Sequence, residues 1–208
     1  MKLLPYIVLL LVSVCFGSLW RIPRNGEYIN NRLSSVVYIQ NSTGVCSGYI
    51  VGKNLVATAG HCISYEKGSM VKYTDGEAVP YAVFSFHYLP SDSNCNADWA
   101  LLMANTGKRK PYVFAKKTPN IGSVLRLLGH PDGDVETHTT PVIYMGLAWD
   151  SSIVVNPTTV PGESGGPVVD EQNEVVATIT CYSTDMSNTG YASSTKNLQK
   201  WIAIAEAK

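Results

Sequence analysis

The sequence predicts an all-β protein, and three observations support this. Only 15% of the residues are charged, tyrosine and valine are frequent, and turn-forming residues recur about every eight to twelve positions. Such a chain forms short strands joined by turns rather than long amphipathic helices. Its 208 residues suffice for one domain, or for two small lobes, with a substantial core.

Ten segments combine β-branched or aromatic residues with flanking turn residues, as strands do. They are residues 35–40, 47–51, 55–59, 81–86, 99–102, 124–128, 141–145, 153–155, 167–169 and 175–180. A single helix is expected at about 195–206, where apolar residues between 198 and 205 follow helical spacing. Hydroxyl residues at 193–195 offer an N-cap for it.

The charges of the chain balance, with 16 lysine and arginine residues against 16 aspartate and glutamate residues. The sequence therefore lacks the electrostatic footprint of a protein that binds nucleic acid or an anionic membrane. We expect neither as a partner.

Two motifs a hundred residues apart indicate nucleophilic catalysis: Thr-Ala-Gly-His-Cys at 58–62 and Gly-Glu-Ser-Gly-Gly-Pro at 162–167. A serine hydroxyl is a poor nucleophile unless a histidine takes its proton and a carboxylate holds that histidine in the right tautomer. Glycines beside Ser164 leave room for an incoming carbonyl and permit a tight turn. Such a turn can direct backbone N–H groups at one point, which is how an oxyanion hole is built.

The order of these residues along the chain selects the type of triad. The serine motif also fits the G-x-S-x-G elbow of α/β-hydrolases. In those enzymes the histidine follows the serine, whereas the last histidine here, His138, precedes Ser164. A subtilisin-like order needs an aspartate before the histidine, but the first aspartate, Asp75, follows His61. The order that remains is histidine, aspartate, serine.

Asp98 is the expected acid because it opens the apolar stretch 99–102, which has the pattern of a strand entering a core. A carboxylate at the start of such a strand can be shielded from water and still face a cleft. Asp92, Asp132 and Asp134 lie among turn residues and are better explained as solvated.

Several segments together resemble the trypsin and chymotrypsin family of serine endopeptidases. The three signature blocks of that family correspond to residues 44–62, 97–102 and 162–167. A further likeness to the bacterial glutamyl endopeptidase branch lies in residues 38–40, 129–133 and 170–175.

The resemblance implies two six-stranded antiparallel β-barrels of the chymotrypsin-like kind, at about 30–110 and 120–192, with the active site in the groove between them. It also implies a polypeptide substrate and no cofactor. The residues it assigns to catalysis are His61 as general base, Asp98 as the group that orients it, Ser164 as nucleophile, and the N–H groups of Gly162 and Ser164 as oxyanion hole.

The first 17 residues have the pattern of a signal peptide. Lys2 precedes an apolar run that ends at Phe16, and Gly17 with Ser18 offers a small-residue cleavage site. The sequence thus predicts a secreted or extracytoplasmic protein comprising residues 18–208, monomeric and not attached to a membrane after signal removal. A lipoprotein anchored through Cys15 is the alternative.

Removal of the signal peptide leaves four cysteines, an even number that suits an oxidising compartment. The family resemblance joins Cys46 to Cys62. An ungapped alignment with the family places Cys95 and Cys181 opposite each other across the groove, so a second disulfide is expected between them, with two buried free thiols as the alternative. His130 and His138 lack metal-ligand spacing, and we expect them to be solvated loop histidines rather than metal ligands.

The residues that the resemblance assigns to substrate binding are Thr158, Thr159, Ile179, Thr180, Cys181 and Tyr182. Glutamyl endopeptidases carry a histidine where this chain has Ile179, and no histidine follows Ser164. Trypsin-like specificity for arginine or lysine would need an acidic residue in place of Thr158. The S1 pocket is therefore expected to be neutral. Thr180 stands where family members carry a hydroxyl that bonds to the triad aspartate.

Two questions stay open at this point. Glu163, directly before the nucleophile, could be a solvated turn residue or a paired one. The alternative to a protease is a catalytically silent homologue that acts as a binding module on the same scaffold.

Overall fold

The computed structural model describes residues 33–41, 44–65, 68–88, 95–182 and 188–207. Its strands are β1 (Val36–Asn41), β2 (Gly44–Gly52), β3 (Leu55–Thr58), β4 (Met70–Tyr73), β5 (Ala78–Pro80), β6 (Ala82–His87), β7 (Trp99–Met103), β8 (Val124–Gly129), β9 (His138–Leu147), β10 (Ile153–Asn156), β11 (Pro167–Val169), β12 (Val175–Tyr182) and β13 (Gly190–Ser194). The helical elements are the 3-10 turns η1 (Gly60–Cys62), η2 (Cys95–Ala97) and η3 (Pro131–Gly133) and the helix α3 (Thr195–Glu206).

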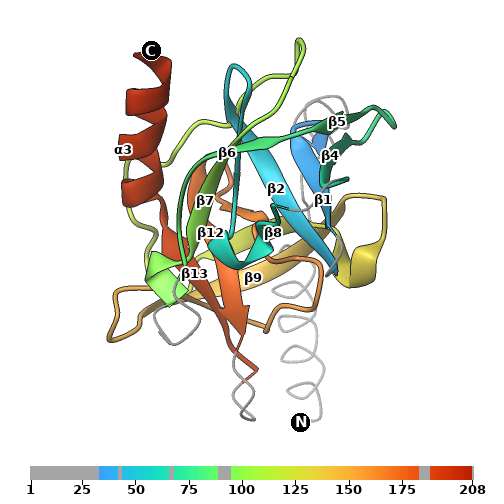
Figure 1. Cartoon of the computed structure of the whole chain (residues 1–208). Coiled ribbons are helices and arrows are strands. Elements are labelled where there is room, and N and C mark those ends of the chain that lie inside the picture. The colour runs from blue at the N-terminus through green and yellow to red at the C-terminus, as the bar shows by residue number, and fades with distance from the viewer. Residues whose placement is uncertain (1–32, 42–43, 66–67, 89–94, 183–187, 208) are drawn as a thin grey trace, which may run out of the picture.

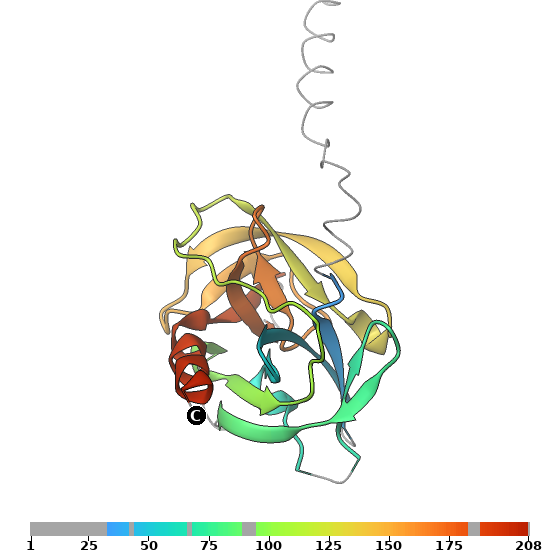
Figure 2. The ribbon, with the colours of Figure 1, turned by 90° about the horizontal axis from the view of Figure 1, so that it is seen from above.

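The strands form two antiparallel sheets, one in each half of the chain (Figure 1). The second half is a closed barrel with the order β10-β13-β12-β11-β8-β9, and the first half is a seven-stranded sheet with the order β5-β4-β1-β2-β3-β7-β6. Seen from above, the two sheets lie on opposite sides of the molecule, with α3 at the edge where they meet (Figure 2). The predicted all-β, chymotrypsin-like fold with a C-terminal helix is confirmed.

The first half differs from the expected six-stranded barrel because its sheet is open. The two edge strands, β5 and β6, are consecutive in the chain and separated only by Tyr81. The chain thus passes from one edge to the other without a hydrogen-bonded ladder between them. Pro80, at the end of β5, has no N–H group to donate to such a ladder.

Side chains point alternately to the two faces of each strand, and the buried ones form three clusters. On β1, Val36 faces the second half, while Val37 and Ile39 face the interior of their own sheet. The second barrel encloses residues such as Leu127 and Val155. Each half therefore has its own core, and a third cluster lies between the halves.

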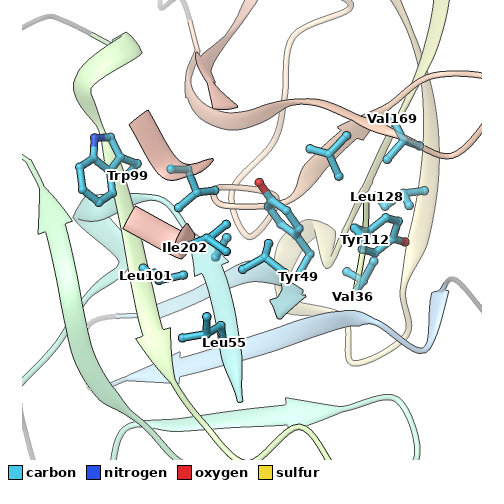
Figure 3. Packing of buried hydrophobic residues seen from close by; sticks show 13 residues of the cluster. Val36, Tyr49, Leu55, Trp99, Leu101, Tyr112, Leu128, Val169 and Ile202 are labelled. Carbon is cyan, nitrogen blue, oxygen red and sulfur yellow. The ribbon is translucent and has the colours of Figure 1, made fainter. Parts of the chain in front are cut away.

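The cluster between the halves joins three parts of the chain (Figure 3). Tyr49 of β2 and Val169 of β11 belong to it, as does Ile202 of α3. The Tyr49 hydroxyl lies 2.7 Å from the Thr178 hydroxyl of β12, so a buried hydrogen bond also crosses the boundary. These contacts fix the position of one sheet relative to the other.

The helix α3 matches the predicted range and begins at the predicted cap. The side chain of Ser194 accepts a hydrogen bond from the backbone N–H of Lys196. Leu198 and Ile202 are buried, and the ring of Trp201 lies 6.1 Å from that of Trp99 on β7. In the described ranges, no helix is both long and apolar enough to cross a membrane.

Three strands, β4, β5 and β13, were not predicted. The first two form a hairpin whose turn contains Gly76. The third contains, besides Tyr191, only small residues of low strand propensity, and it is a strand because it pairs with both β10 and β12.

Candidate active site

His61 and Asp98 meet at the ends of two neighbouring strands. The short turn η1 places His61 directly after β3, and Asp98 lies between η2 and β7, which pairs with β3. Nδ1 of His61 is 2.6 Å from Oδ2 of Asp98, and the backbone N–H of His61 donates to Oδ1 at 2.9 Å. The ring therefore carries its proton on Nδ1, which leaves Nε2 free to accept one.

The carboxylate of Asp98 is shielded from water, with 6% of the residue exposed. A Cβ atom at Gly60 would lie only 2.9 Å from Oδ1 of Asp98, so glycine at this position lets the chain approach the carboxylate. Of the other aspartates considered, Asp132 and Asp134 are exposed, and Asp92 lies outside the described residues. The geometry thus pairs His61 with Asp98.

Ser164 lies in the turn that precedes β11, beside the segment that carries His61. Its carbonyl oxygen accepts a hydrogen bond from the backbone N–H of Ser47 on β2 at 2.8 Å. The Sγ atom of Cys62 lies 3.7 Å from the same oxygen. The turn of the second half is therefore held directly against the histidine segment of the first.

The glycines around Ser164 have the conformations that a tight turn requires. Gly162 has φ +93° and Gly165 has φ +85°, both in the region that favours glycine. Within the described part of the chain, the N–H groups of Gly162 and Ser164 donate to no acceptor. These two donors therefore have no competing acceptor there.

Glu163 is buried and hydrogen-bonded rather than solvated. It is 3% exposed; one carboxylate oxygen accepts from the backbone N–H of Val160 at 2.9 Å and the other from the hydroxyl of Thr140 at 3.2 Å. Burial raises the pKa of Glu163 above its ordinary value, and these two hydrogen bonds only partly oppose the shift. The paired interpretation is therefore correct, with uncharged partners.

The predicted S1 residues lie in two groups. The hydroxyl of Thr158 donates to the carbonyl of Thr189 at 3.2 Å, and Thr159 is buried. On β12, Ile179 is fully buried in the core of the second barrel, while Tyr182 is 54% exposed. The second group thus runs from the interior of the barrel to its surface.

Thr180 has different partners from those that the family resemblance implies. Its hydroxyl lies 2.8 Å from the carbonyl oxygen of Cys95 and 3.4 Å from that of Tyr191. The two oxygens of Asp98 are instead bonded to His61. The threonine hydroxyl therefore fixes the turn η2 that precedes Asp98 rather than the carboxylate itself.

Gly190, at the start of β13, was not recognised from the sequence. A Cβ atom here would lie 3.0 Å from Cγ2 of Thr159 and 3.2 Å from Cγ2 of Val155. Glycine thus lets the Thr159 segment approach β13 closely. The available signal was an isolated glycine beside a strand, which is typical of a close backbone approach.

Two disulfides connect elements near His61 and Asp98. Cys46 of β2 is bonded to Cys62 of η1, and Cys95 of η2 is bonded to Cys181 of β12. The first anchors the segment that carries His61. The second joins the two halves beside Asp98.

One group of possible metal ligands occurs among the described residues, and its chemistry argues against a metal there. Ligand atoms of Cys46, His61 and Cys62 lie within 4.8 Å of one another. Because the two cysteines form a disulfide, they offer no thiolate ligands.

The expectation that His130 is solvated is wrong. It is 1% exposed, and its Nδ1 donates to the backbone carbonyls of Asp134 and Glu136. Burial lowers the pKa of His130. By contrast, His138 is exposed and pairs with Asp134 at 2.8 Å.

The fold, together with the pairing of His61 with Asp98, is that of the chymotrypsin-like serine protease class. The chain belongs to the trypsin-like peptidase domain family, whose sequence model matches residues 46–177. It is 27% identical over 160 residues to a glutamyl endopeptidase of Bacillus licheniformis, an alignment that covers 67% of this chain and 49% of the relative. The chain thus spans about half the length of this curated relative. The predicted family is confirmed.

Solved structures show the same fold. The serine endoprotease from Yersinia pestis has a TM-score of 0.73 at 20% identity, over 86% of this chain and 65% of that one. The active form of the Rv3671c protease from M. tuberculosis has a TM-score of 0.72 at 20% identity, over 84% of this chain and 82% of that one. At these identities the likeness concerns the fold alone.

Proposed function

We propose that the protein is a serine endopeptidase that cleaves peptide bonds through an acyl-enzyme. Ser164 is the nucleophile, His61 the base that takes its proton and later protonates the leaving amine, and Asp98 the group that holds the imidazole. The observation that carries this proposal is the 2.6 Å contact between His61 Nδ1 and the shielded carboxylate of Asp98. It selects the tautomer whose Nε2 can act as the base.

The N–H groups of Gly162 and Ser164 complete the mechanism as the oxyanion hole. As the serine oxygen attacks, the carbonyl oxygen of the substrate becomes an oxyanion, and fixed donors stabilise that charge without reorganising. The positive φ of Gly162 and the absence of competing acceptors among the described residues support this role.

The S1 pocket is proposed to be neutral. Thr158 and Thr159 offer hydroxyl groups but no charge. A charged P1 side chain taken out of water without a partner is disfavoured by several kcal/mol, or becomes neutral. The preferred P1 residue is therefore uncharged.

Export is proposed from residues 1–17, and the two disulfides support it because such bonds persist in oxidising compartments. Expression with the intact leader and amino-terminal sequencing of the secreted protein tests this proposal. A mature chain beginning at Ser18 is the expected result, and retention inside the cell with residues 1–17 attached would contradict it.

A fluorophosphonate probe tests the catalytic proposal directly. The folded protein should become covalently labelled at Ser164, and neither Ser164→Ala nor His61→Ala should be labelled. Absence of labelling in the folded wild-type protein would instead favour the silent binding module.

A further inference from the structure

Ser47, on β2 of the first half, is a buried serine with four hydrogen bonds around the nucleophile turn. It is fully buried. Its backbone N–H donates to the carbonyl of Ser164 at 2.8 Å, and its carbonyl accepts from the hydroxyl of Thr58 at 2.7 Å. Its own hydroxyl donates to the carbonyl of Gly162 at 2.7 Å and accepts from the backbone N–H of His130 at 2.9 Å.

The carbonyl that the Ser47 hydroxyl holds belongs to the residue whose N–H would bind the oxyanion. Glycine can rotate its flanking peptide groups with little steric cost, so the direction of the Gly162 N–H must be fixed by other contacts. The carbonyl of Pro161, in the peptide that contains this N–H, accepts from the backbone N–H of Asp132 at 2.7 Å. Ser47 fixes the peptide on the other side of Gly162.

The same serine also fixes the turn that holds Pro161. Through its hydroxyl it accepts from His130, directly before η3, and η3 contains Asp132. A Cβ atom at Gly129 would lie 2.9 Å from Oγ of Ser47, so the chain leaves room for this hydroxyl. The Ser47 side chain therefore contacts the Gly162 carbonyl directly and, through His130, the turn that holds Pro161.

We propose that Ser47 is a positioning residue for the oxyanion hole. Its hydroxyl orients the peptides on both sides of Gly162 so that the N–H points at the developing charge. Ser47 itself touches no reacting atom. The inference rests on the proposed protease function.

The test is Ser47→Ala, assayed on a peptide substrate and with a peptide boronic acid that forms a tetrahedral anion on the serine. Loss of an oxyanion donor outright costs about 10²–10³ in kcat, so loss of its support should cost about 10–100-fold. KM should change by less than about threefold, because the effect is confined to the transition state. The affinity for the boronic acid should fall in parallel with kcat/KM.

Ser35→Ala is the matched control. Ser35 is also fully buried, and its hydroxyl donates to the carbonyl of Lys110 at 2.6 Å, away from the nucleophile turn. Both variants should lower Tm, Ser47→Ala by more because it loses two buried hydrogen bonds rather than one, but only Ser47→Ala should lower kcat. If Ser47→Ala fails to fold, Ser47→Cys can be measured in the same assays. Cysteine keeps the shape of serine, but its thiol is a weak hydrogen-bond donor.

Equal kcat in the two variants, or a fall in kcat without weaker boronic acid binding, would overturn the inference. Fluorophosphonate labelling of the wild-type protein separates this result from a failure of the proposed function. An unlabelled wild-type protein contradicts the protease itself, whereas a labelled one with a fully active Ser47→Ala variant contradicts only the role of Ser47.

Discussion

The carboxylate of Asp98 bonds to His61 twice, once at the ring Nδ1 at 2.6 Å and once at the backbone N–H at 2.9 Å. It thereby orients both the imidazole and the chain segment that carries it. Because Asp98 is almost fully buried, these bonds are stronger than they would be in water.

Asp98→Asn should lower kcat by about 10⁴ at neutral pH, because the amide favours the wrong imidazole tautomer. Asp134→Asn is the control, since Asp134 forms an exposed pair with His138 at 2.8 Å. It should leave kcat unchanged. Steady-state kinetics on one peptide substrate compares the two variants, and near-full activity of Asp98→Asn would refute its role as the triad acid.

Ser164→Ala and His61→Ala should each lower kcat by several orders of magnitude, and the double variant should lose little more than either single one. Members of a triad act as a unit, so their effects are not additive. Single-turnover rates with circular dichroism spectra check the result. Losses that multiply in the double variant would argue against a shared mechanism.

Replacing Cys46 and Cys62 by alanine should lower the free energy of unfolding by about 3 kcal/mol on the chain-entropy estimate. The bond between Cys95 and Cys181 spans 86 residues and should contribute about 4.5 kcal/mol on the same estimate. Urea unfolding measures both values. Peptide mapping without reduction should recover both bridges, and alkylated free thiols in secreted protein would contradict them.

Glu163→Gln should change how stability depends on pH. Because the pKa of Glu163 is raised in the folded protein, the folded state binds more protons than the unfolded chain between the two pKa values. The contribution of Glu163 to the free energy of unfolding is thus largest below the ordinary carboxyl pKa, and it falls as pH rises through the raised pKa. Glutamine can accept from Val160 and donate to Thr140 without ionising.

Urea unfolding over a pH series should therefore show Glu163→Gln gaining stability relative to the wild-type protein as pH rises through this window. The exposed Glu171, changed to Gln, should show no such gain. A constant difference between wild type and Glu163→Gln at all pH values would mean that the carboxyl is not perturbed by burial.

Thr158→Asp should create a preference for arginine and lysine at P1, because a carboxylate there could pair with a buried cation. The matched variant Thr158→Asn adds the same bulk without charge and should keep the neutral preference. Cleavage of a peptide library by all three proteins measures P1 directly. A wild-type profile dominated by glutamate would show that a cation reaches the pocket from elsewhere.

Most of the fold could be predicted because its strands carry β-branched and aromatic residues bounded by turn residues. The strand β12, with a run of six buried residues at 175–180, is an example. The helix α3 could be predicted from the helical spacing of its apolar residues. The strand β13 could not be predicted because one tyrosine among four small residues is too weak a pattern by itself. Pairing with two neighbours determines its conformation.

The candidate site, too, could be predicted from the sequence only in part. Chain order and local motifs single out His61, Asp98 and Ser164, because triad chemistry constrains residue type and order. Glu163 and His130, by contrast, are held by residues far away in the sequence: Thr140 bonds to Glu163, and Tyr38 and Ser47 of the first half contact His130. Such tertiary contacts leave no local signal in the sequence. The partner of the Thr180 hydroxyl was missed for the same reason.

The bridge between Cys95 and Cys181 also determines what happens to a chain that has been nicked. The only covalent backbone link between the two sheets runs through residues 104–123, which lie between these two cysteines in the sequence. A single cut anywhere in that link leaves two fragments that the disulfide still holds together. Autolysis at this connection would therefore yield two fragments joined in one covalent molecule, which separates into two bands only after reduction.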